Sequence, residues 1–86
     1  MTAEMDLRVR VLDAWDDVVM RLPALTPIAD VKRRALDAAH INADPAGFLV
    51  KFRGAEVRDE SRSLDDERVP GNGALIVMRR RRVPVL

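Results

Sequence analysis

The stretch LRVRVL, from Leu7 to Leu12, decides the fold because apolar and basic side chains alternate along it. A period of two is typical of a β-strand with one buried face and one face in water. Leu7, Val9 and Val11 are therefore predicted to point into the core, and the two arginines between them to the opposite face of the sheet.

A second apolar run, Val18 to Leu22, follows the first at the distance of a β-hairpin. The residues between the two runs, Asp13 to Asp17 (DAWDD), are acidic and typical of a turn. We expect the two strands to pair antiparallel, with alternate residues from Val18 onward on the core face. Pro23 is predicted to end the second strand, because proline has no N–H to donate to a sheet.

Thr26 followed by Pro27 predicts a helix start, with the threonine hydroxyl as the N-cap and the proline as the first helical residue. Apolar residues then recur at steps of three and four, which is typical of a helix that lies on a sheet. The predicted apolar stripe comprises Ile28, Val31, Ala35 and either Ala38 or Ala39. Other faces of the helix are predicted to carry Lys32, Arg33, Arg34 and Asp37. The turn-forming stretch NADPAG, residues 42 to 47, is expected to end the helix.

Two further strands and a charged loop are predicted in the second half of the chain. The segment FLVKF, Phe48 to Phe52, alternates like a strand, and a turn leads from it into a short strand at Ala55 to Val57. A charged loop follows, in which Leu64 and Val69 are expected to anchor to the core. The near-continuous apolar run ALIVM, Ala74 to Met78, is typical of a central strand.

This order of elements resembles the β-grasp fold of ubiquitin-like proteins over residues 5 to 80. The helix start of that family is similar to Thr26, Ile28, Asp30, Val31 and Lys32, with Pro27 inserted. The later elements of the family are similar to Phe52, Arg53, Gly54, Leu64, Asp66, Val69 and the run Leu75 to Val77. The resemblance implies an α+β β-grasp domain over residues 5–80, with a mixed four- to five-stranded sheet packed on one helix, and a basic and apolar C-terminal tail over residues 81–86.

Length and composition limit the chain to one small domain. Its 86 residues leave no room for a second core, and 48% hydrophobic with 34% charged residues argue against disorder. The absence of cysteine excludes disulfides and thiolate metal sites and favours the cytoplasm. No apolar run reaches the ~18 residues of a membrane span. Arginine far outnumbers lysine, which favours a bacterial, GC-rich genome.

Candidate catalytic and metal-binding residues are few. His40 is the only histidine and lies near the predicted helix end, where a cation is favourable. The acidic hairpin turn lacks the glycine and glutamate of a calcium loop, and Ser61 and Ser63 have no neighbouring base. We therefore expect no catalytic residue, no metal site and no cofactor, and the chain is predicted not to be an enzyme.

Strand alternation assigns one set of side chains to the sheet face opposite the helix. Arg21 is assigned to this face, and the predicted partner-binding residues on it are Arg8, Arg10, Leu49, Lys51, Arg53, Ile76, Met78 and Arg80. Because the first, last and third strands of a β-grasp sheet are neighbours, Ile76 and Met78 are predicted to form an apolar island within a basic rim. Such a patch is typical of a protein-binding site, although a solvated face covered by arginine stems gives the same pattern.

Trp15, at the tip of the predicted hairpin, has two interpretations. An exposed indole is enriched in binding hot spots and would belong to the partner-binding residues. In the alternative interpretation the ring folds back over the edge of the sheet. The sequence leaves both open.

The sequence thus predicts a noncovalent protein-interaction module or an accessory subunit, similar to the ubiquitin-like components that accompany bacterial secretion systems and multicomponent enzymes. An alternative is binding of nucleic acid or an anionic surface through the arginine-rich face and tail, although the scarcity of aromatic residues argues against base stacking. A covalent modifier or sulfur carrier is disfavoured, because the resemblance implies a terminal pair of glycines and Gly73 is the last glycine. The identity of the partner and the oligomeric state stay open.

We expect the protein to be inert to ubiquitin-type activation, because no glycine follows Gly73. Incubation with ATP and candidate activating enzymes, followed by mass spectrometry, should detect no adenylate, thiocarboxylate or conjugate. An adduct at the C-terminus, formed with or without trimming of the tail, would contradict this expectation.

Overall fold

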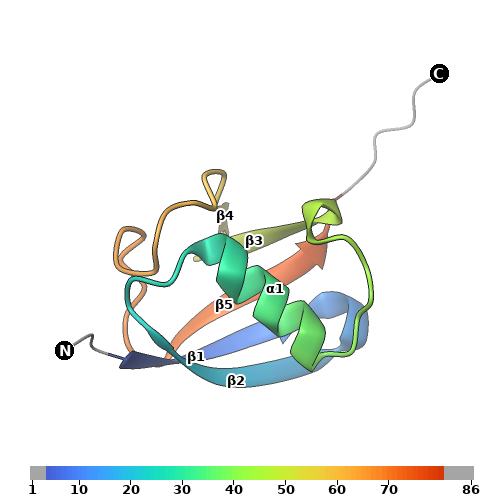
Figure 1. The fold of residues 1–86 in the computed structure, drawn as a ribbon, viewed down its shortest axis with the longest axis horizontal. Helices are drawn as coiled ribbons and strands as arrows, with labels where there is room; N and C mark the ends of the chain where they lie inside the picture. The colour runs from blue at the N-terminus through green and yellow to red at the C-terminus, as the bar shows by residue number, and fades with distance from the viewer. Residues whose placement is uncertain (1–3, 81–86) are drawn as a thin grey trace.

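The computed structural model describes residues 4 to 80 of the chain. This part contains five strands and one α-helix (Figure 1). The elements are β1 (Glu4–Val11), β2 (Asp16–Pro23), α1 (Ile28–Ala38), β3 (Phe48–Phe52), β4 (Ala55–Glu56) and β5 (Gly73–Arg79), with short 3-10 turns at Leu12–Ala14 and Pro45–Gly47. The predicted tail, residues 81–86, lies outside the described residues.

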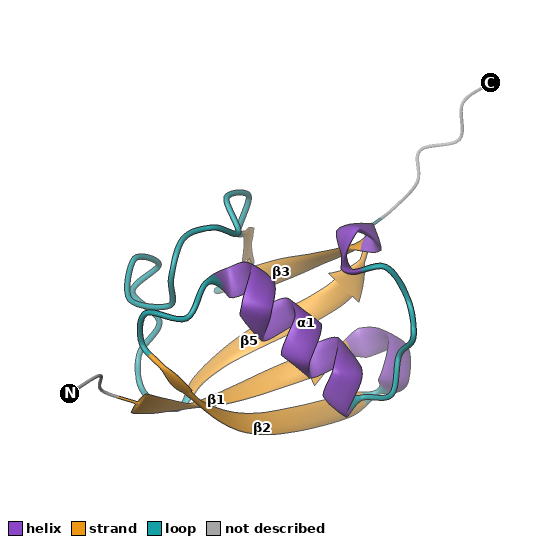
Figure 2. Ribbon diagram, in the orientation of Figure 1, coloured by secondary structure: helices purple, strands orange, loops and turns teal. Residues whose placement is uncertain are grey.

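The strands form one mixed sheet in the order β2-β1-β5-β3-β4. β1 and β5 run parallel at its centre, and the other neighbouring strands are antiparallel. α1 crosses a single face of this sheet (Figure 2). This arrangement confirms the predicted α+β β-grasp architecture. The prediction allowed four or five strands, and the sheet has five.

The predicted alternation of buried and exposed side chains is confirmed along the central strands. The parallel pairing sets Val9 beside Leu75 and Val11 beside Val77. These four side chains point to the same face of the sheet, toward the helix, and are buried. The core beneath the helix is made by Leu7, Val9, Val11, Leu22, Ile28, Val31, Ala35, Phe48, Val50, Leu75 and Val77. Leu64 is fully buried in the loop between β4 and β5, which confirms one of the two predicted anchors, and Val69 confirms the other.

The helix start differs from the prediction. Pro27, not Thr26, is the N-cap residue, and no side chain caps the helix. The first two helical N–H groups donate instead to the backbone carbonyls of Arg62 and Glu60 in the loop between β4 and β5, both at 2.9 Å. The predicted threonine cap is wrong because this loop supplies the acceptors that a side chain would otherwise provide.

Lys32 is buried, contrary to the prediction that it lies on an exposed face of the helix. It is four residues from both Ile28 and Leu36, which are buried, so its side chain must face the sheet. Its Nζ donates to the Phe48 carbonyl at 3.0 Å and pairs with Glu60 at 2.7 Å, while the side chain is only 4% exposed. One ammonium group therefore ties α1 to β3 and to the loop that caps the helix.

The predicted apolar stripe is confirmed at Ile28, Val31 and Ala35 and at its end by Ala39, which packs against the core, but it leaves out Leu36. Leu36 is buried, whereas Ala38 is exposed and Ala39 is half-buried. The stripe is wider than a strict seam, since Ala35 and Leu36 both contact the core. The prediction misses Leu36 because it assumes one narrow row of apolar residues along the helix.

The hairpin turn between β1 and β2 is shorter than predicted. The Trp15 N–H donates to the Leu12 carbonyl at 3.1 Å, and β2 starts at Asp16, opposite Val11. Trp15 has φ 51° and ψ 39°, a left-handed conformation that returns the chain into register at once. Asp16 and Asp17, predicted as turn residues, therefore belong to the strand.

Two substitutions in the core and two on the opposite face test this two-sided sheet. Val31→Asp or Leu75→Asp should unfold the domain, because an unpaired charge would enter the core of a domain with about 5 kcal/mol of stability. Arg8→Asp and Ile76→Asp, at exposed positions, should lower the melting temperature far less. Circular dichroism melts measure the effect, and equal damage by all four variants would contradict the assignment.

Replacing the buried lysine should cost more than replacing an exposed basic residue of the same helix. Lys32→Met should destabilise the domain by about 3 kcal/mol or more, because it leaves the mostly buried carboxylate of Glu60 without its nearest cation. Glu60→Gln in the same chain should restore part of the loss. Arg33→Met, which breaks only an exposed pair with Asp30, should cost under about 0.5 kcal/mol. Urea unfolding measures the stability of all three variants. Equal losses for Lys32→Met and Arg33→Met would contradict this prediction.

Candidate interaction face

The sheet face away from α1, which we call the outer face, gathers the side chains that alternate with the core. Its residues in the four longer strands are Glu4, Asp6, Arg8, Arg10, Asp17, Val19, Arg21, Leu49, Lys51, Ala74, Ile76 and Met78. Most of the predicted partner-binding residues are in this set, so the structure brings them onto one surface. Their role in binding stays a prediction.

An apolar strip runs along β5 in the middle of the outer face. It comprises Ala74, Ile76 and Met78 of β5, with Leu49 of β3 beside Met78. Ile76 is flanked by Arg10 in β1 and by Lys51 in β3. Arg8 lies beside Ala74. The predicted apolar island is therefore present, with basic residues on both sides.

Two adjoining hollows lie beside the apolar strip. One, of about 220 Å³, is lined by Asp6, Leu7, Arg8, Val19, Asn72 and Ala74. The other, of about 290 Å³, is lined by Arg8, Arg10, Asp17, Ala74, Leu75 and Ile76. Both include Ala74, whose methyl group is much shorter than the side chains around it. The strip therefore ends in a shallow recess that can receive a side chain of a partner.

Val19 and Ala74 belong to the outer face but are not among the predicted partner-binding residues. Val19 is 70% exposed and borders the smaller hollow. The same alternation identifies both, because Val19 follows Val18, and Ala74 precedes Leu75, two residues that face the core. The sequence pattern predicts that Val19 points away from the core, but the predicted partner-binding residues include neither Val19 nor Ala74.

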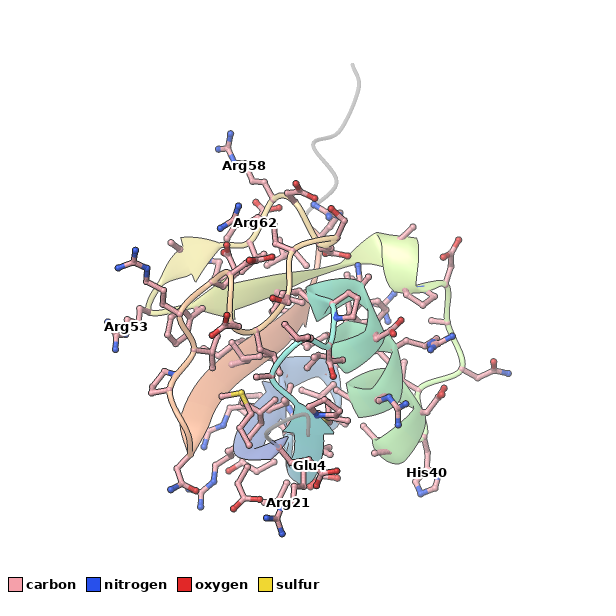
Figure 3. The ribbon with its side chains drawn as sticks, turned by 60° about the vertical axis from the view of Figure 1, so that its left-hand side comes forward. Glu4, Arg21, His40, Arg53, Arg58 and Arg62 are labelled. Atoms are coloured by element: carbon pink, nitrogen blue, oxygen red, sulfur yellow. The ribbon has the colours of Figure 1, made fainter. Side chains whose placement is uncertain are left out.

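Acidic residues neutralise part of the predicted basic rim. Arg10 Nε pairs with Asp17 Oδ1 at 2.9 Å. Arg21 lies 3.4 Å from Glu4, and the two side chains are neighbours in Figure 3. Asp6 lies 3.8 Å from the same arginine. The predicted rim is too basic, because the sequence pattern assigns Asp17 to the turn and begins the first strand after both acidic residues of β1.

The pair between Arg10 and Asp17 is a charged one at neutral pH. The hydrogen bond from Arg10 lowers the pKa of Asp17 below its usual value, so the carboxylate stays ionised to a lower pH than a free aspartate. The same hydrogen bond raises the pKa of Arg10. Both groups are exposed, so the pair contributes little to stability but removes one net positive charge from the outer face.

Arg8 and Lys51 keep their positive charge on the outer face. Neither forms a salt bridge with any residue between 4 and 80. They lie on opposite sides of the apolar strip, Arg8 next to Ala74 and Lys51 next to Ile76. The outer face thus offers an apolar strip between two cations that can accept a partner's carboxylate.

Arg53 and Arg80, predicted on the outer face by strand alternation, lie just beyond the ends of β3 and β5. Arg53 and Gly54 have φ of 52° and 82°, the two positive values of a type I′ turn, so strand alternation does not extend to Arg53 (Figure 3). Arg80 follows the end of β5 and donates to Glu56 at 3.2 Å. Its guanidinium also lies 3.9 Å from the Glu60 carboxylate. Contacts within the chain therefore occupy Arg80.

Trp15 does not fold back over the edge of the sheet. It is 90% exposed, the highest value among the large apolar residues that the structure describes. The structure thus decides between the two interpretations of this residue in favour of an exposed indole at the hairpin tip.

His40 has a structural position at the helix end. It follows the C-cap residue Ala39 and has a φ of 60°. Its N–H donates to the Asp37 carbonyl at 3.0 Å, and the Ile41 N–H donates to the Leu36 carbonyl at 2.9 Å. These two hydrogen bonds are those of a Schellman motif, in which the left-handed residue reverses the chain.

Residues 4 to 80 contain neither a cluster of metal-ligating side chains nor a helix that could span a membrane. No group of three His, Cys, Asp or Glu side chains in this part of the chain could hold a metal ion. No helix in the same part is long and apolar enough to cross a membrane.

The fold is similar to those of solved ubiquitin-like proteins. The ubiquitin-like domain of an Arabidopsis thaliana protein, solved by solution NMR, matches with a TM-score of 0.73 at 12% identity, over 88% of this chain and 77% of that chain. The ubiquitin of Caldiarchaeum subterraneum matches with a TM-score of 0.78 at 10% identity, over 92% of this chain and 96% of that chain.

Comparisons of sequence alone add nothing to these similarities. No protein-family model matches the chain, and no curated protein matches it either. The TM-scores of 0.73 and 0.78 establish a shared architecture, and at 10% to 12% identity they establish no shared function. From its strand order and from these structures, the chain has the ubiquitin-like β-grasp fold.

Proposed function

We propose that the protein is a noncovalent protein-interaction module, or an accessory subunit of a larger assembly, that binds its partner through the outer face. The cysteine-free, arginine-rich composition favours the cytoplasm of a bacterium as its place of action. The observation that supports the proposal best is the apolar strip in the middle of the outer face.

The apolar strip has no evident role in the fold. Ile76 is 36% exposed on β5, and its side chain points away from the core that Leu75 and Val77 enter. Strand pairing uses the backbone of this residue and does not require an apolar side chain. Met78 and Leu49 extend the apolar surface, and both are half-buried by their neighbours. An apolar centre with a polar rim is the usual composition of a protein-protein interface.

The charges around the apolar strip favour a protein partner with acidic groups. Arg8 and Lys51 flank the strip and have no acidic partner among the described residues. Complementary charges at an interface rim raise the association rate and exclude wrongly charged partners. We therefore expect carboxylates on the partner on both sides of its apolar contact.

Binding of nucleic acid or an anionic surface has less support. Carboxylates already neutralise Arg10 and Arg21 on the outer face. Arg79, the first of the four consecutive arginines at positions 79 to 82, pairs with Asp13 at 2.8 Å and lies 4.8 Å from the centre of the Phe48 ring. An arginine that must give up such contacts gains less from a phosphate.

Ile76→Ala together with Met78→Ala should weaken the binding of a protein partner by about 30-fold, or about 2 kcal/mol, because buried apolar anchors dominate interface energies. Proteins that co-purify with the tagged wild-type chain are identified by mass spectrometry and produced separately. Isothermal calorimetry of each purified protein with the wild-type and variant chains measures the effect.

Leu25→Ala is the matched control for the double variant. Leu25 is 67% exposed in the connection between β2 and α1, outside the outer face, so this change should leave the affinity unaltered. Equal losses for Leu25→Ala and the double variant would count against the proposal. So would binding of single-stranded DNA that falls steeply with salt and is insensitive to the two alanines.

A further inference from the structure

The hairpin between β1 and β2 has a tryptophan at a position where the backbone favours glycine. Trp15 closes the turn by donating its N–H to the Leu12 carbonyl at 3.1 Å, and it has φ 51° and ψ 39°. A tight turn followed by one left-handed residue is a common hairpin connection, and glycine is the usual left-handed residue because it has no Cβ. A bulky side chain in this conformation is an outlier.

Packing does not compensate for this strain. Trp15 is 90% exposed and lies outside the hydrophobic core, whereas Ala14, the residue before it, packs against the core. Other contacts hold the turn, since Val11 pairs with Asp16 and Asp13 accepts a hydrogen bond from an arginine of β5 at 2.8 Å. Neither the strand register nor the turn requires the indole. The left-handed conformation of Trp15 therefore lowers the stability of the fold without a compensating contact.

The rest of the chain uses its aromatic residues differently. The sequence has one tryptophan and two phenylalanines. Phe48 is buried and Phe52 packs against the core, so both phenylalanines stabilise the fold. A residue that breaks a local rule without helping the fold is expected at a functional site, and tryptophan is among the residues most enriched in binding hot spots.

We infer that Trp15 is an anchor that inserts into an apolar pocket of a partner protein with a basic rim. The charge around Trp15 supports the basic rim. Asp13, Asp16 and Asp17 flank the indole in the sequence and are all exposed. Asp13 and Asp17 pair with arginines of β5 and β1, whereas Asp16 forms no salt bridge with any residue that the structure describes. The carboxylate of Asp16, next to the indole, therefore makes the hairpin tip acidic, so the tip is repelled by an anionic membrane and complements a cationic surface.

The hairpin tip is a contact site separate from the hollows of the outer face. Val11, the last residue of β1, pairs with Val77, so the tip lies beyond the Met78 end of the apolar strip. One partner can contact both sites, but they consist of different side chains. The inference extends the proposed function without depending on it, and each site can be removed alone.

The first test measures the stability of the protein without any partner. Trp15→Gly should raise the melting temperature by about 4 °C or more, because glycine relieves the strained conformation. Trp15→Asn should also raise it, since asparagine tolerates the same conformation. Val19→Gly, a matched change at an exposed strand position, should lower it. A lower melting temperature for Trp15→Gly in a circular dichroism melt overturns the inference, because the indole would then stabilise the fold.

The second test measures binding with the purified co-purifying proteins. Trp15→Gly and Trp15→Asn should weaken the affinity of at least one of them by about tenfold or more, and Trp15→Phe should weaken it less. If each purified protein binds Trp15→Gly as tightly as the wild-type chain, the inference fails. The double alanine variant at Ile76 and Met78 tests the outer face separately. A negative result for Trp15 therefore does not contradict binding through the outer face, and the reverse also holds.

The same variants distinguish a protein pocket from other occupants. Phosphatidylserine vesicles and increasing concentrations of the protein itself are each tested for a blue shift of the fluorescence of Trp15, the only tryptophan. No shift is expected with either, because the acidic tip repels an anionic membrane and the partner is a different protein. A shift with vesicles, or self-association that disappears in Trp15→Gly, overturns the inference.

Discussion

The whole arrangement depends on the burial of one face of the sheet beneath a single helix. Because successive side chains of a strand alternate, burying Val9 and Val11 forces Arg10 to the other face, and burying Leu75 and Val77 does the same for Ile76. One helix cannot cover the face alone, so the loop between β4 and β5 adds its own apolar anchors and caps the helix start. The ammonium of Lys32 then joins helix, strand and loop at one point.

Most of the fold could be predicted from the sequence because it follows from periodicity. Apolar residues recur every two residues in the strands and every three or four residues in the helix, and these intervals predict both the elements and the side chains that enter the core. Lys32 could not be predicted as buried, since its interior partners come from residues distant in the chain, the Phe48 carbonyl and Glu60. The same holds for the helix start, where tertiary contacts with the loop replaced the side-chain cap that Thr26 suggested.

The candidate site could be predicted in part. Alternation placed Arg8, Lys51 and Ile76 on one face, and the strand order brought them together. The charge balance could not be predicted, because the ion pair between Arg10 and Asp17 depends on where the hairpin turn ends. The fold itself does not select a function, since proteins that share it at 10% to 12% identity need not share partners.

Amide chemical shifts in isotope-labelled protein test most directly the claim that the outer face and the hairpin tip, not the helix, contact the partner. Titration with a purified co-purifying protein should shift the signals of residues 74 to 78 and of Trp15, including its indole N–H. The signals of Arg33 and Arg34, exposed on α1, should stay unchanged. Shifts concentrated on α1, with unchanged signals along β5 and at the hairpin tip, would contradict this account.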